Sequence, residues 1–336
     1  MGRADVSFGS GSGISRTCIV GGAGFIGSHF VDRLLGSTET ESLTVFDNFS
    51  SGREWHLDGH AEDPRLRVVR GDAAELESLA EAVAGSDTVI HLASNPDIAR
   101  AVVEPAIDFD AGTLLTHHVL EAMRLSGATR IVYASGSGIY GDLGEVEVDE
   151  DHGPLSPIST YGASKLAGEA LISAYCYMFG LSGYVFRFGN VVGPRQTHGV
   201  GYDFIRRLSN EPGHLRVLGD GRQSKSYIHV ADVVEAVLMA AARTSAPVAT
   251  YNVATGDYMT VSEIAHMTLE VMGLDPRATQ LEFTGSDRGW RGDVPVVRLS
   301  TKRLRALGWT SARSTRMAMR AALESILEDA SSGRLT

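Results

Sequence analysis

The chain has 336 residues, of which 43% are hydrophobic, and this is enough apolar material for the core of one large or two modest domains. Its formal net charge of -11 is spread over many short segments without the basic stripe that binds a phosphate backbone, which excludes nucleic acid as an expected partner. No apolar run reaches the roughly 18 to 20 residues of a membrane span, and the N-terminus lacks a basic region followed by an apolar one, so we expect a cytoplasmic protein that does not bind membranes.

The cysteines and histidines predict neither disulfides nor a metal site. Cys18 and Cys176 both lie in apolar surroundings, which is typical of small core residues in a reducing compartment. No H-E-x-x-H motif occurs, so we expect no catalytic metal.

The first ordered segment is expected after a disordered leader at 1–15, which contains a Gly-Ser-Gly-Ser-Gly run. A strand at 17–20 then leads into a glycine-rich turn and a helix that continues to Leu35. In that turn Gly21 permits a tight bend, Gly24 lets the backbone approach a pyrophosphate, and Gly27 lets the helix pack against the strand. The spacing is GxxGxxG, and the order of strand, glycine turn and helix favours a dinucleotide site at the helix N-terminus.

The second strand, at 43–46, ends in Asp47, which follows Gly27 by 20 residues. A carboxylate at this place accepts hydrogen bonds from the adenosine ribose hydroxyls. Because its negative charge would repel a 2'-phosphate, we expect NAD and not NADP.

Strands alternate with helices along the next part of the chain. The further strands are expected at 66–69, 88–92, 130–133 and 183–187, and the helices at 74–84, 109–126 and 159–179. Ligands bind beyond the carboxyl ends of the strands in an open parallel sheet, so the small and polar residues that follow each strand are expected to line one crevice. We predict an α/β fold with a Rossmann-type doubly wound parallel sheet and a smaller mixed α/β C-terminal region.

Tyr161 and Lys165 stand four residues apart in Ser-Thr-Tyr-Gly-Ala-Ser-Lys and therefore share one face of the expected helix. A fixed cation beside a phenol favours the phenolate and is expected to lower its pKa, which would make Tyr161 a base. This spacing is also common in ordinary helices, so its catalytic interpretation depends on the dinucleotide site.

Six motifs in chain order carry a resemblance to a known family. They are GGAGFIGSH at 21–29, DNFSSG at 47–52, GD at 71–72, HLAS at 91–94, YGASK at 161–165 and NVVGPR at 190–195. With them the chain resembles the extended short-chain dehydrogenase/reductase family, and within it the NAD-dependent nucleotide-sugar 4-epimerases of the UDP-galactose 4-epimerase type. Stretches at 198–208, 218–233 and 288–294 are similar to the substrate lobe of a compact bacterial and archaeal branch.

This resemblance implies an NAD-binding domain at 16–180, to which later segments return, and a domain at 181–330 that mainly binds the nucleotide diphosphate sugar. It also implies a homodimer formed through the helices at 109–126 and 159–179. In the implied reaction Tyr161 takes the proton of the sugar 4-hydroxyl while the 4-hydrogen leaves as hydride, and the keto-sugar turns before the hydride returns to its other face. Lys165 also holds the nicotinamide ribose.

The site residues that the resemblance implies form two sets. The NAD-binding set is Gly21, Gly24, Phe25, Ile26, Gly27, Asp47, Asn48, Ser50, Ser51, Gly52, Asp72, Ala73, Leu92, Ala93, Ser94, Tyr161, Lys165, Phe188 and Val191. The substrate-binding set is Ser135, Gly136, Ser137, Asn190, Gly199, Val200, Lys225, Tyr227, Arg288 and Arg291. The substrate is expected to be a UDP-hexose or UDP-hexuronate.

The loop before Tyr140 separates the activities of related enzymes. Sugar 4,6-dehydratases carry an Asp-Glu pair where this chain has Ser137 and Gly138, and nucleotide-glucuronate decarboxylases carry a glutamate at the second position. Epimerisation needs no extra acid and is therefore favoured. A variant dehydratase, a dehydrogenase and a non-catalytic NAD-binding regulator remain alternatives.

Two departures from the family pattern mark this chain. Gly136 stands where the family places its catalytic Ser or Thr, and we hypothesise that Ser137 or an ordered water binds the 4-hydroxyl instead; alternatively, the serines beside Gly136 only satisfy backbone groups. Gly112 replaces an asparagine, and a glycine inside a helix indicates close packing or a kink.

Overall fold

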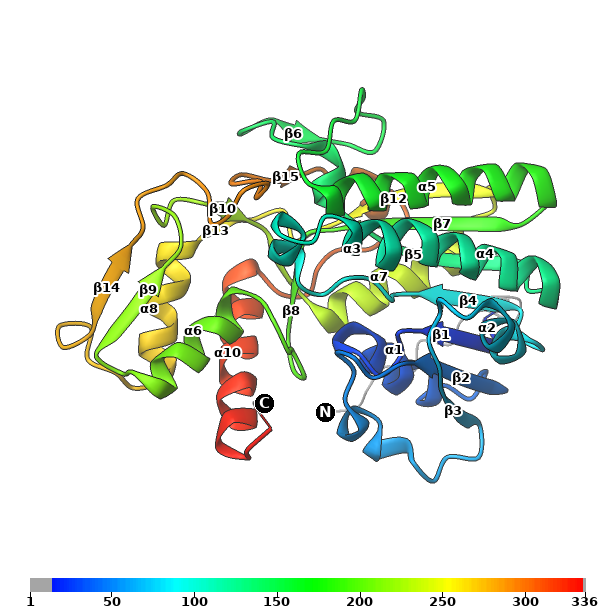
Figure 1. The fold of residues 1–336 in the computed structure, drawn as a ribbon, viewed down its shortest axis with the longest axis horizontal. Helices are drawn as coiled ribbons and strands as arrows, with labels where there is room; N and C mark the ends of the chain where they lie inside the picture. Colours follow the sequence, from blue (N-terminus) through cyan, green and yellow to red (C-terminus); the bar gives the residue numbers. More distant parts are fainter. Residues whose placement is uncertain (1–13, 335–336) are drawn as a thin grey trace.

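Seven parallel strands form the central sheet of the computed structural model, which describes residues 14–334 (Figure 1). The strands are β1 (Arg16–Val20), β2 (Ser42–Asp47), β3 (Leu66–Arg70), β4 (Thr88–His91), β5 (Arg130–Gly136), β7 (Ser182–Phe188) and β12 (Val248–Val253). Their order across the sheet is β12-β7-β5-β4-β1-β2-β3, so the chain reverses its winding direction between β1 and β4. Ligands bind at such a reversal, beyond the carboxyl ends of the strands. The predicted doubly wound sheet is confirmed.

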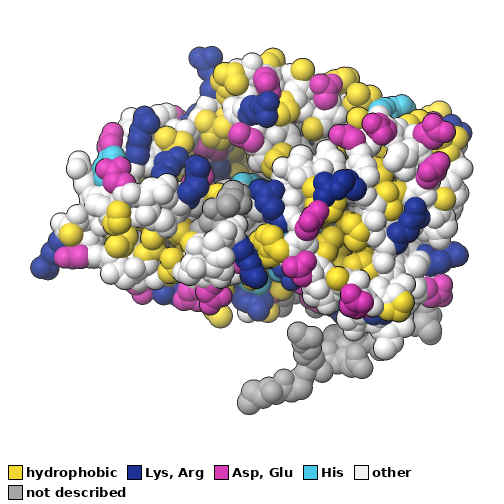
Figure 2. Space-filling view, turned by 60° about the horizontal axis from the view of Figure 1, so that its bottom comes forward, with side chains coloured by type: hydrophobic (Ala, Val, Ile, Leu, Met, Phe, Trp, Pro, Cys, Tyr) yellow, Lys and Arg dark blue, Asp and Glu magenta, His cyan; other side chains and the backbone are white. Residues whose placement is uncertain are grey.

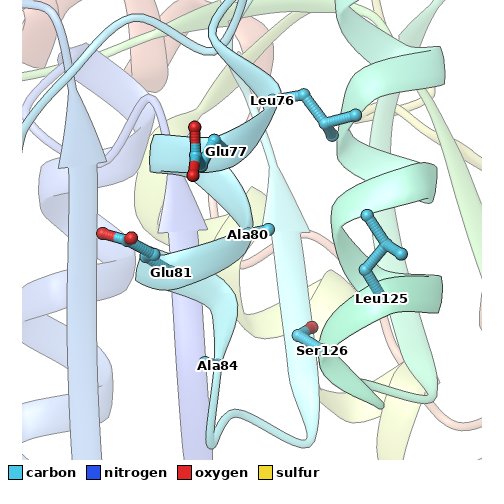
Figure 3. Close-up of a pocket in the computed structure, with 7 residues that line it drawn as sticks. All are labelled: Leu76, Glu77, Ala80, Glu81, Ala84, Leu125 and Ser126. Atoms are coloured by element: carbon cyan, nitrogen blue, oxygen red, sulfur yellow. The ribbon is translucent and has the colours of Figure 1, made fainter.

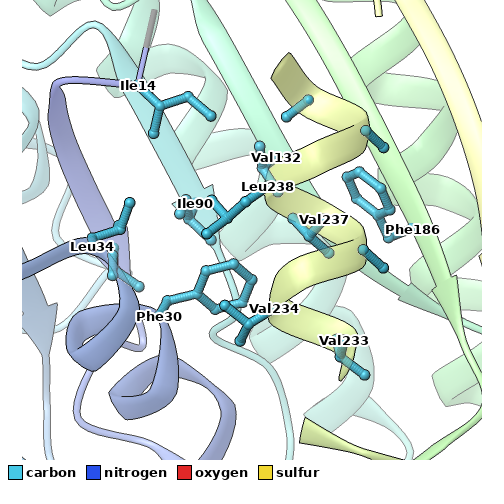
Figure 4. Close-up of a cluster of buried hydrophobic side chains, with 14 of the residues drawn as sticks. Ile14, Phe30, Leu34, Ile90, Val132, Phe186, Val233, Val234, Val237 and Leu238 are labelled. Carbon is cyan, nitrogen blue, oxygen red and sulfur yellow. The ribbon is translucent and has the colours of Figure 1, made fainter. Parts of the chain in front are cut away.

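Helices cover both faces of this sheet. On one face lie α1 (Phe25–Leu35) and α7 (Val230–Arg243), and on the other lie α2 (Leu76–Val83), α4 (Leu115–Ser126) and α5 (Thr160–Phe179). Figure 4 shows Phe30 of α1 beside Val234 of α7, with Ile90 of β4 beside Leu238 of α7. The apolar residues of α1 recur at helical spacing, which explains why one stripe of this helix is buried.

A smaller C-terminal lobe lies beside the sheet, at the left of Figure 1. It is built from α6 (Val200–Asn210), α8 (Val261–Val271) and α10 (Thr315–Ser331) around a separate core, with β9 (His214–Val217) paired to β14 (Gln280–Phe283). The remaining pairs are β8 (Asn190–Val192) with β11 (Tyr227–His229), β10 (Ser224–Lys225) with β13 (Met259–Thr260), and β6 (Glu147–Val148) with β15 (Arg298–Leu299). Acidic and basic side chains are interspersed over the face in Figure 2.

The expected leader ends earlier than the sequence indicates. Residues 1–13 lie outside the described residues, but the expectation for Ile14 and Ser15 was wrong. Ile14 is buried in the core shown in Figure 4, and the Ser15 carbonyl accepts the amides of Glu41 and Ser42 at 2.9 and 3.3 Å. These bonds extend the edge between β1 and β2 by one residue.

Both cysteines are buried, as expected for core residues. Within residues 14–334 no group of three or more acidic, histidine or cysteine side chains could hold a metal ion. Each helix within these residues is too short or too polar to span a bilayer.

The helix expected at 109–126 begins with a distorted segment. After α3 (Ala106–Asp108), residues Phe109–Leu114 form a π-helix, η4, and α4 follows. A Cβ atom at Gly112 would lie 2.5 Å from the Ser164 hydroxyl of α5, so the expected close packing is confirmed. π-Helical segments of this kind occur frequently at functional sites.

A buried ion pair fixes α5 on the sheet. Arg187 of β7 donates from Nη2 and Nε to the Glu169 carboxylate of α5, at 2.8 and 3.1 Å, and the two side chains are 6% and 9% exposed. Arg187 also donates to the Tyr140 hydroxyl at 2.8 Å, and that hydroxyl donates to Asn252 of β12 at 2.8 Å. The network thus joins α5, β7, β12 and the loop after β5.

Glu169→Ala is expected to lower the free energy of unfolding by about 3 to 5 kcal/mol, because it leaves the buried Arg187 charge without its partner. Urea unfolding followed by circular dichroism measures this. Glu104→Ala is the matched control: Glu104 pairs with Arg100 at 2.7 Å, but both side chains are about half exposed, so the loss should stay within about 0.5 kcal/mol. Equal losses in the two variants would contradict the structural role of the buried pair.

Candidate active site

The glycine turn after β1 leaves an open helix N-terminus at the carboxyl edge of the sheet. Gly21 has a φ of +86°, and a Cβ there would lie 2.8 Å from the Ala93 nitrogen, so only glycine lets β1 pass the end of β4. A Cβ at Gly27 would lie 2.3 Å from the Gly21 carbonyl oxygen. Gly24 caps α1 without a side-chain hydrogen bond, so the first amides of α1 can bind a pyrophosphate.

Asp47, at the end of β2, holds this turn against the loop that follows. Its carboxylate accepts the Ala23 amide at 2.9 Å and the Phe49 amide at 2.8 Å, and it is 7% exposed. Burial raises the pKa of this carboxyl, and the backbone amides oppose the rise. These amides do not fill all of the roughly four lone-pair sites of a carboxylate, so Asp47 can still accept a ribose hydroxyl. In the same loop Asn48 donates to Asp72 at 3.1 Å.

A pocket that the sequence did not predict lies beside Asp47. Residues lining it are Phe49, Gly52, Arg53, Glu54, Trp55, Asp58 and Arg70. The Arg70 guanidinium lies 4.1 Å from the centre of the Phe49 ring and is paired with Glu54 at 2.6 Å. No local motif predicts that Arg70 lines this pocket, because Arg70 belongs to the neighbouring strand β3. A second pocket, between α2 and α4, contains none of the predicted site residues (Figure 3).

Tyr161 and Lys165 lie together at the start of α5, which Ser159 caps by accepting the Gly162 amide at 3.1 Å. The Lys165 ammonium donates to the Ala134 carbonyl at 2.9 Å and lies 5.5 Å from the centre of the Tyr161 ring. Lys165 is 3% exposed, and burial lowers its pKa to about 8 against the opposing charges of Asp108 and Glu169.

The expectation that Lys165 lowers the pKa of Tyr161 was wrong for this structure. Burial raises that pKa to about 12, while a contact from the Ser94 hydroxyl lowers it and the Asp108 carboxylate adds to the rise. The Lys165 ammonium donates to the Ala134 carbonyl, and desolvation of the phenolate is the largest cause of the raised pKa of Tyr161.

The two serines at the end of β5 and in the loop after it differ in their hydrogen bonding. Ser135 is buried and donates to Glu169 at 2.5 Å, so its predicted role in substrate binding was wrong and it belongs to the network that fixes α5. Ser137 begins η5 (Ser137–Tyr140), and its hydroxyl forms no hydrogen bond with residues 14–334, which leaves it available to a ligand. Gly136 has extended backbone, and a Cβ there would meet only Tyr161 Cε1, at 4.0 Å.

Three other predicted substrate contacts need correction. Lys225 is paired with Asp293 at 2.6 Å and Arg288 with Asp142 at 2.6 Å, so neither cation presents a free charge to a diphosphate. Tyr227 is 2% exposed in the core of the C-terminal lobe and cannot contact a ligand with its ring face. These partners are 68 and 146 residues away in sequence, beyond the reach of a local pattern.

The other predicted substrate residues are open to ligands. Gly199, with a φ of +102°, precedes Val200 at the start of α6 and leaves that helix without a side-chain cap. Asn190 pairs through its backbone with Tyr227, and its side-chain amide forms no hydrogen bond within the described residues. Arg291 is exposed.

Comparison with known proteins shows the family of the chain. The family model "NAD dependent epimerase/dehydratase family" matches residues 17–254. A putative UDP-glucose 4-epimerase of Methanocaldococcus jannaschii is 32% identical over 87% of this chain and 92% of its own length.

Two solved structures extend the comparison. A UDP-galactose 4-epimerase superposes with a TM-score of 0.81 at 35% identity, covering 94% of this chain and 99% of its own. The dTDP-glucose 4,6-dehydratase DesIV of Streptomyces venezuelae, a double mutant with NAD bound, superposes with a TM-score of 0.87 at 26% identity, covering 96% of this chain and all of its own.

Asp47→Asn is expected to narrow the preference for NAD over NADP by about tenfold, because it removes the charge that repels a 2'-phosphate. Isothermal titration with each dinucleotide measures the two dissociation constants. Asp58→Asn, in the exposed rim of the neighbouring pocket, should leave their ratio unchanged. An unchanged ratio in Asp47→Asn would show that another group sets the preference.

Proposed function

The chain belongs to the NAD dependent epimerase/dehydratase family and uses NAD, and we propose that it epimerises a nucleotide diphosphate sugar, preferably a UDP-sugar, at C4. The observation that supports this best is the composition of the crevice. Lys165 lies 5.5 Å from the centre of the Tyr161 ring, whereas Ser137 and Gly138 stand where a dehydratase would need its acid and base. The epimerase relatives support the same reaction.

In this proposal Tyr161 removes the proton of the 4-hydroxyl and returns it to the same oxygen after the keto-sugar has turned. NAD, when bound, would supply a positively charged ring that can accept the hydride from C4 and give it back. Lys165 holds the ribose beside it. No net proton or hydride is lost, so the product has the mass of the substrate.

Ser137 is proposed to bind the sugar 4-hydroxyl. It directly follows Gly136, whose Cβ position faces the Tyr161 ring, and its hydroxyl has no hydrogen-bond partner in the described residues. A serine hydroxyl can orient the substrate oxygen but cannot supply the acid that eliminates water from C5 and C6.

A 4,6-dehydratase is the second candidate, because DesIV superposes as well as the epimerase does. A panel of UDP-, dTDP- and GDP-sugars, with products read by mass spectrometry and chromatography, separates the candidates. We expect a C4 epimer of unchanged mass and no accumulated NADH. Loss of one water would identify a dehydratase, lasting NADH absorbance a dehydrogenase, and no conversion a regulator.

Tyr161→Phe should lower kcat by about 10³-fold or more in the same assay, because it removes the proposed base and leaves the ring. Binding of NAD, measured by titration, should change little. A variant that keeps more than a tenth of the turnover would contradict the role of Tyr161.

We propose that the protein forms a homodimer through α4 and α5. Four apolar side chains at the ends of these helices are exposed, namely Leu125, Tyr177, Met178 and Phe179, and Arg124 lies over the Phe179 ring. Exposed apolar patches of this kind mark interfaces.

Light scattering after gel filtration measures the mass of the particle in solution. The wild type should have the mass of two chains, and Met178→Glu should shift the mass toward that of one chain. A monomeric wild type would contradict the proposal.

A further inference from the structure

Asp47 and the loop that follows it hold one residue of the glycine turn at both of its backbone polar groups. The Ala23 amide donates to the Asp47 carboxylate at 2.9 Å. The Ala23 carbonyl accepts the Arg53 amide at 3.1 Å and Nδ1 of His56 at 2.7 Å. A Cβ atom at Gly52 would lie 3.0 Å from the Ala23 carbonyl carbon, so the loop is packed directly against the turn.

The His56 ring makes a hydrogen bond only to this carbonyl. The side chain is 1% exposed, and its second nitrogen, Nε2, is buried without a hydrogen-bond partner among residues 14–334. Burial lowers the pKa of His56 to about 4, so the ring is neutral near pH 7. Because a carbonyl only accepts, the single ring hydrogen lies on Nδ1 and is donated to Ala23.

Neighbouring contacts keep the ring in place. His56 ends the short helix η1 (Glu54–His56), and its ring meets that of Trp55 edge-on, with 4.3 Å between the ring centres. The guanidinium of Arg334, which follows α10, lies 4.9 Å from the centre of the Trp55 ring. Since α10 belongs to the C-terminal lobe, the loop is held between that lobe and the glycine turn.

The orientation of the peptide between Ala23 and Gly24 affects any anion at the start of α1. In this planar trans peptide the Ala23 carbonyl and the Gly24 amide point in opposite directions. The helix begins at Phe25, and its first amides form the anion site. A carbonyl oxygen turned toward that site would repel phosphates, whereas one bonded to the buried His56 ring is turned into the protein.

We propose that His56 is a positioning residue for NAD, which keeps the Ala23 carbonyl turned away from the pyrophosphate. It acts through Ala23, which lies 33 residues earlier in the sequence, and the glycine motif does not include it. The inference concerns the binding of the cofactor. It goes beyond the proposed reaction at C4 and does not depend on it.

Two variants and two nucleotide fragments test this. His56→Leu removes the Nδ1 donor, whereas the amide of His56→Asn can take its place. ADP carries the pyrophosphate and adenosine does not. Isothermal titration of the nucleotide-free protein with NAD, ADP and adenosine measures the three dissociation constants.

The expected loss is confined to ligands with a pyrophosphate. His56→Leu should raise the dissociation constants of NAD and ADP by about tenfold, the effect of one hydrogen bond, and should leave that of adenosine within about twofold. His56→Asn should keep all three within about threefold of wild type. If circular dichroism shows that His56→Leu does not fold, His56→Gln replaces it, because its amide lies at the position of Nε2 and not of Nδ1.

His60→Leu is the matched control. His60 belongs to the same loop, but its Nε2 donates to Asp32 of α1 at 2.9 Å and not to the glycine turn. This variant should leave the ratio of the ADP and adenosine constants unchanged.

The outcomes decide on the inference without reference to turnover. An unchanged ADP constant in His56→Leu would overturn it. Equal losses for ADP and adenosine would also overturn it, because they would show that His56 only supports the loop. A wild-type protein that binds NAD but converts no sugar would contradict the proposed function and leave this inference standing.

Discussion

The geometry of the active site depends on the buried ion pair between Glu169 and Arg187. Tyr161, Lys165 and Glu169 are spaced four residues apart on α5, so the pair that fixes Glu169 to β7 also sets the rotation of the helix. Asp108 fixes the start of the same helix through Thr160. With both ends of this face held, the phenol of Tyr161 is directed to the carboxyl edge of the sheet, where the helix N-terminus of α1 is open.

The site contains the Tyr161 and Lys165 pair but departs from the family pattern at two glycines beside it. Glycine at position 136 removes the hydroxyl that the resemblance implies, and glycine at position 112 brings α4 and its π-helical start close to Ser164. Both changes are on elements that pack against α5. In the proposed function the hydroxyl of Ser137, which begins η5, binds the sugar instead.

The sequence predicted what short segments determine on their own. The strand, glycine turn and helix at 16–35 and the spacing of Tyr161 and Lys165 are local patterns, and the structure shows both arrangements. It could not predict partners that come from distant segments. Lys225 forms an ion pair with Asp293, and Ser135 donates a hydrogen bond to Glu169. Neither side chain is therefore retained among the expected substrate contacts. The pKa of Tyr161 was also beyond reach, since it is dominated by burial, which depends on the packed fold.

In the proposed reaction a hydride leaves C4 of a nucleotide sugar and returns to C4. The most direct measurement is nuclear magnetic resonance of the products formed from a UDP-sugar that carries deuterium at C4. Both epimers are expected to retain the deuterium at C4, because the hydride never leaves the crevice. Deuterium found at C6 of a product that has lost one water, or in free NADH, would contradict it.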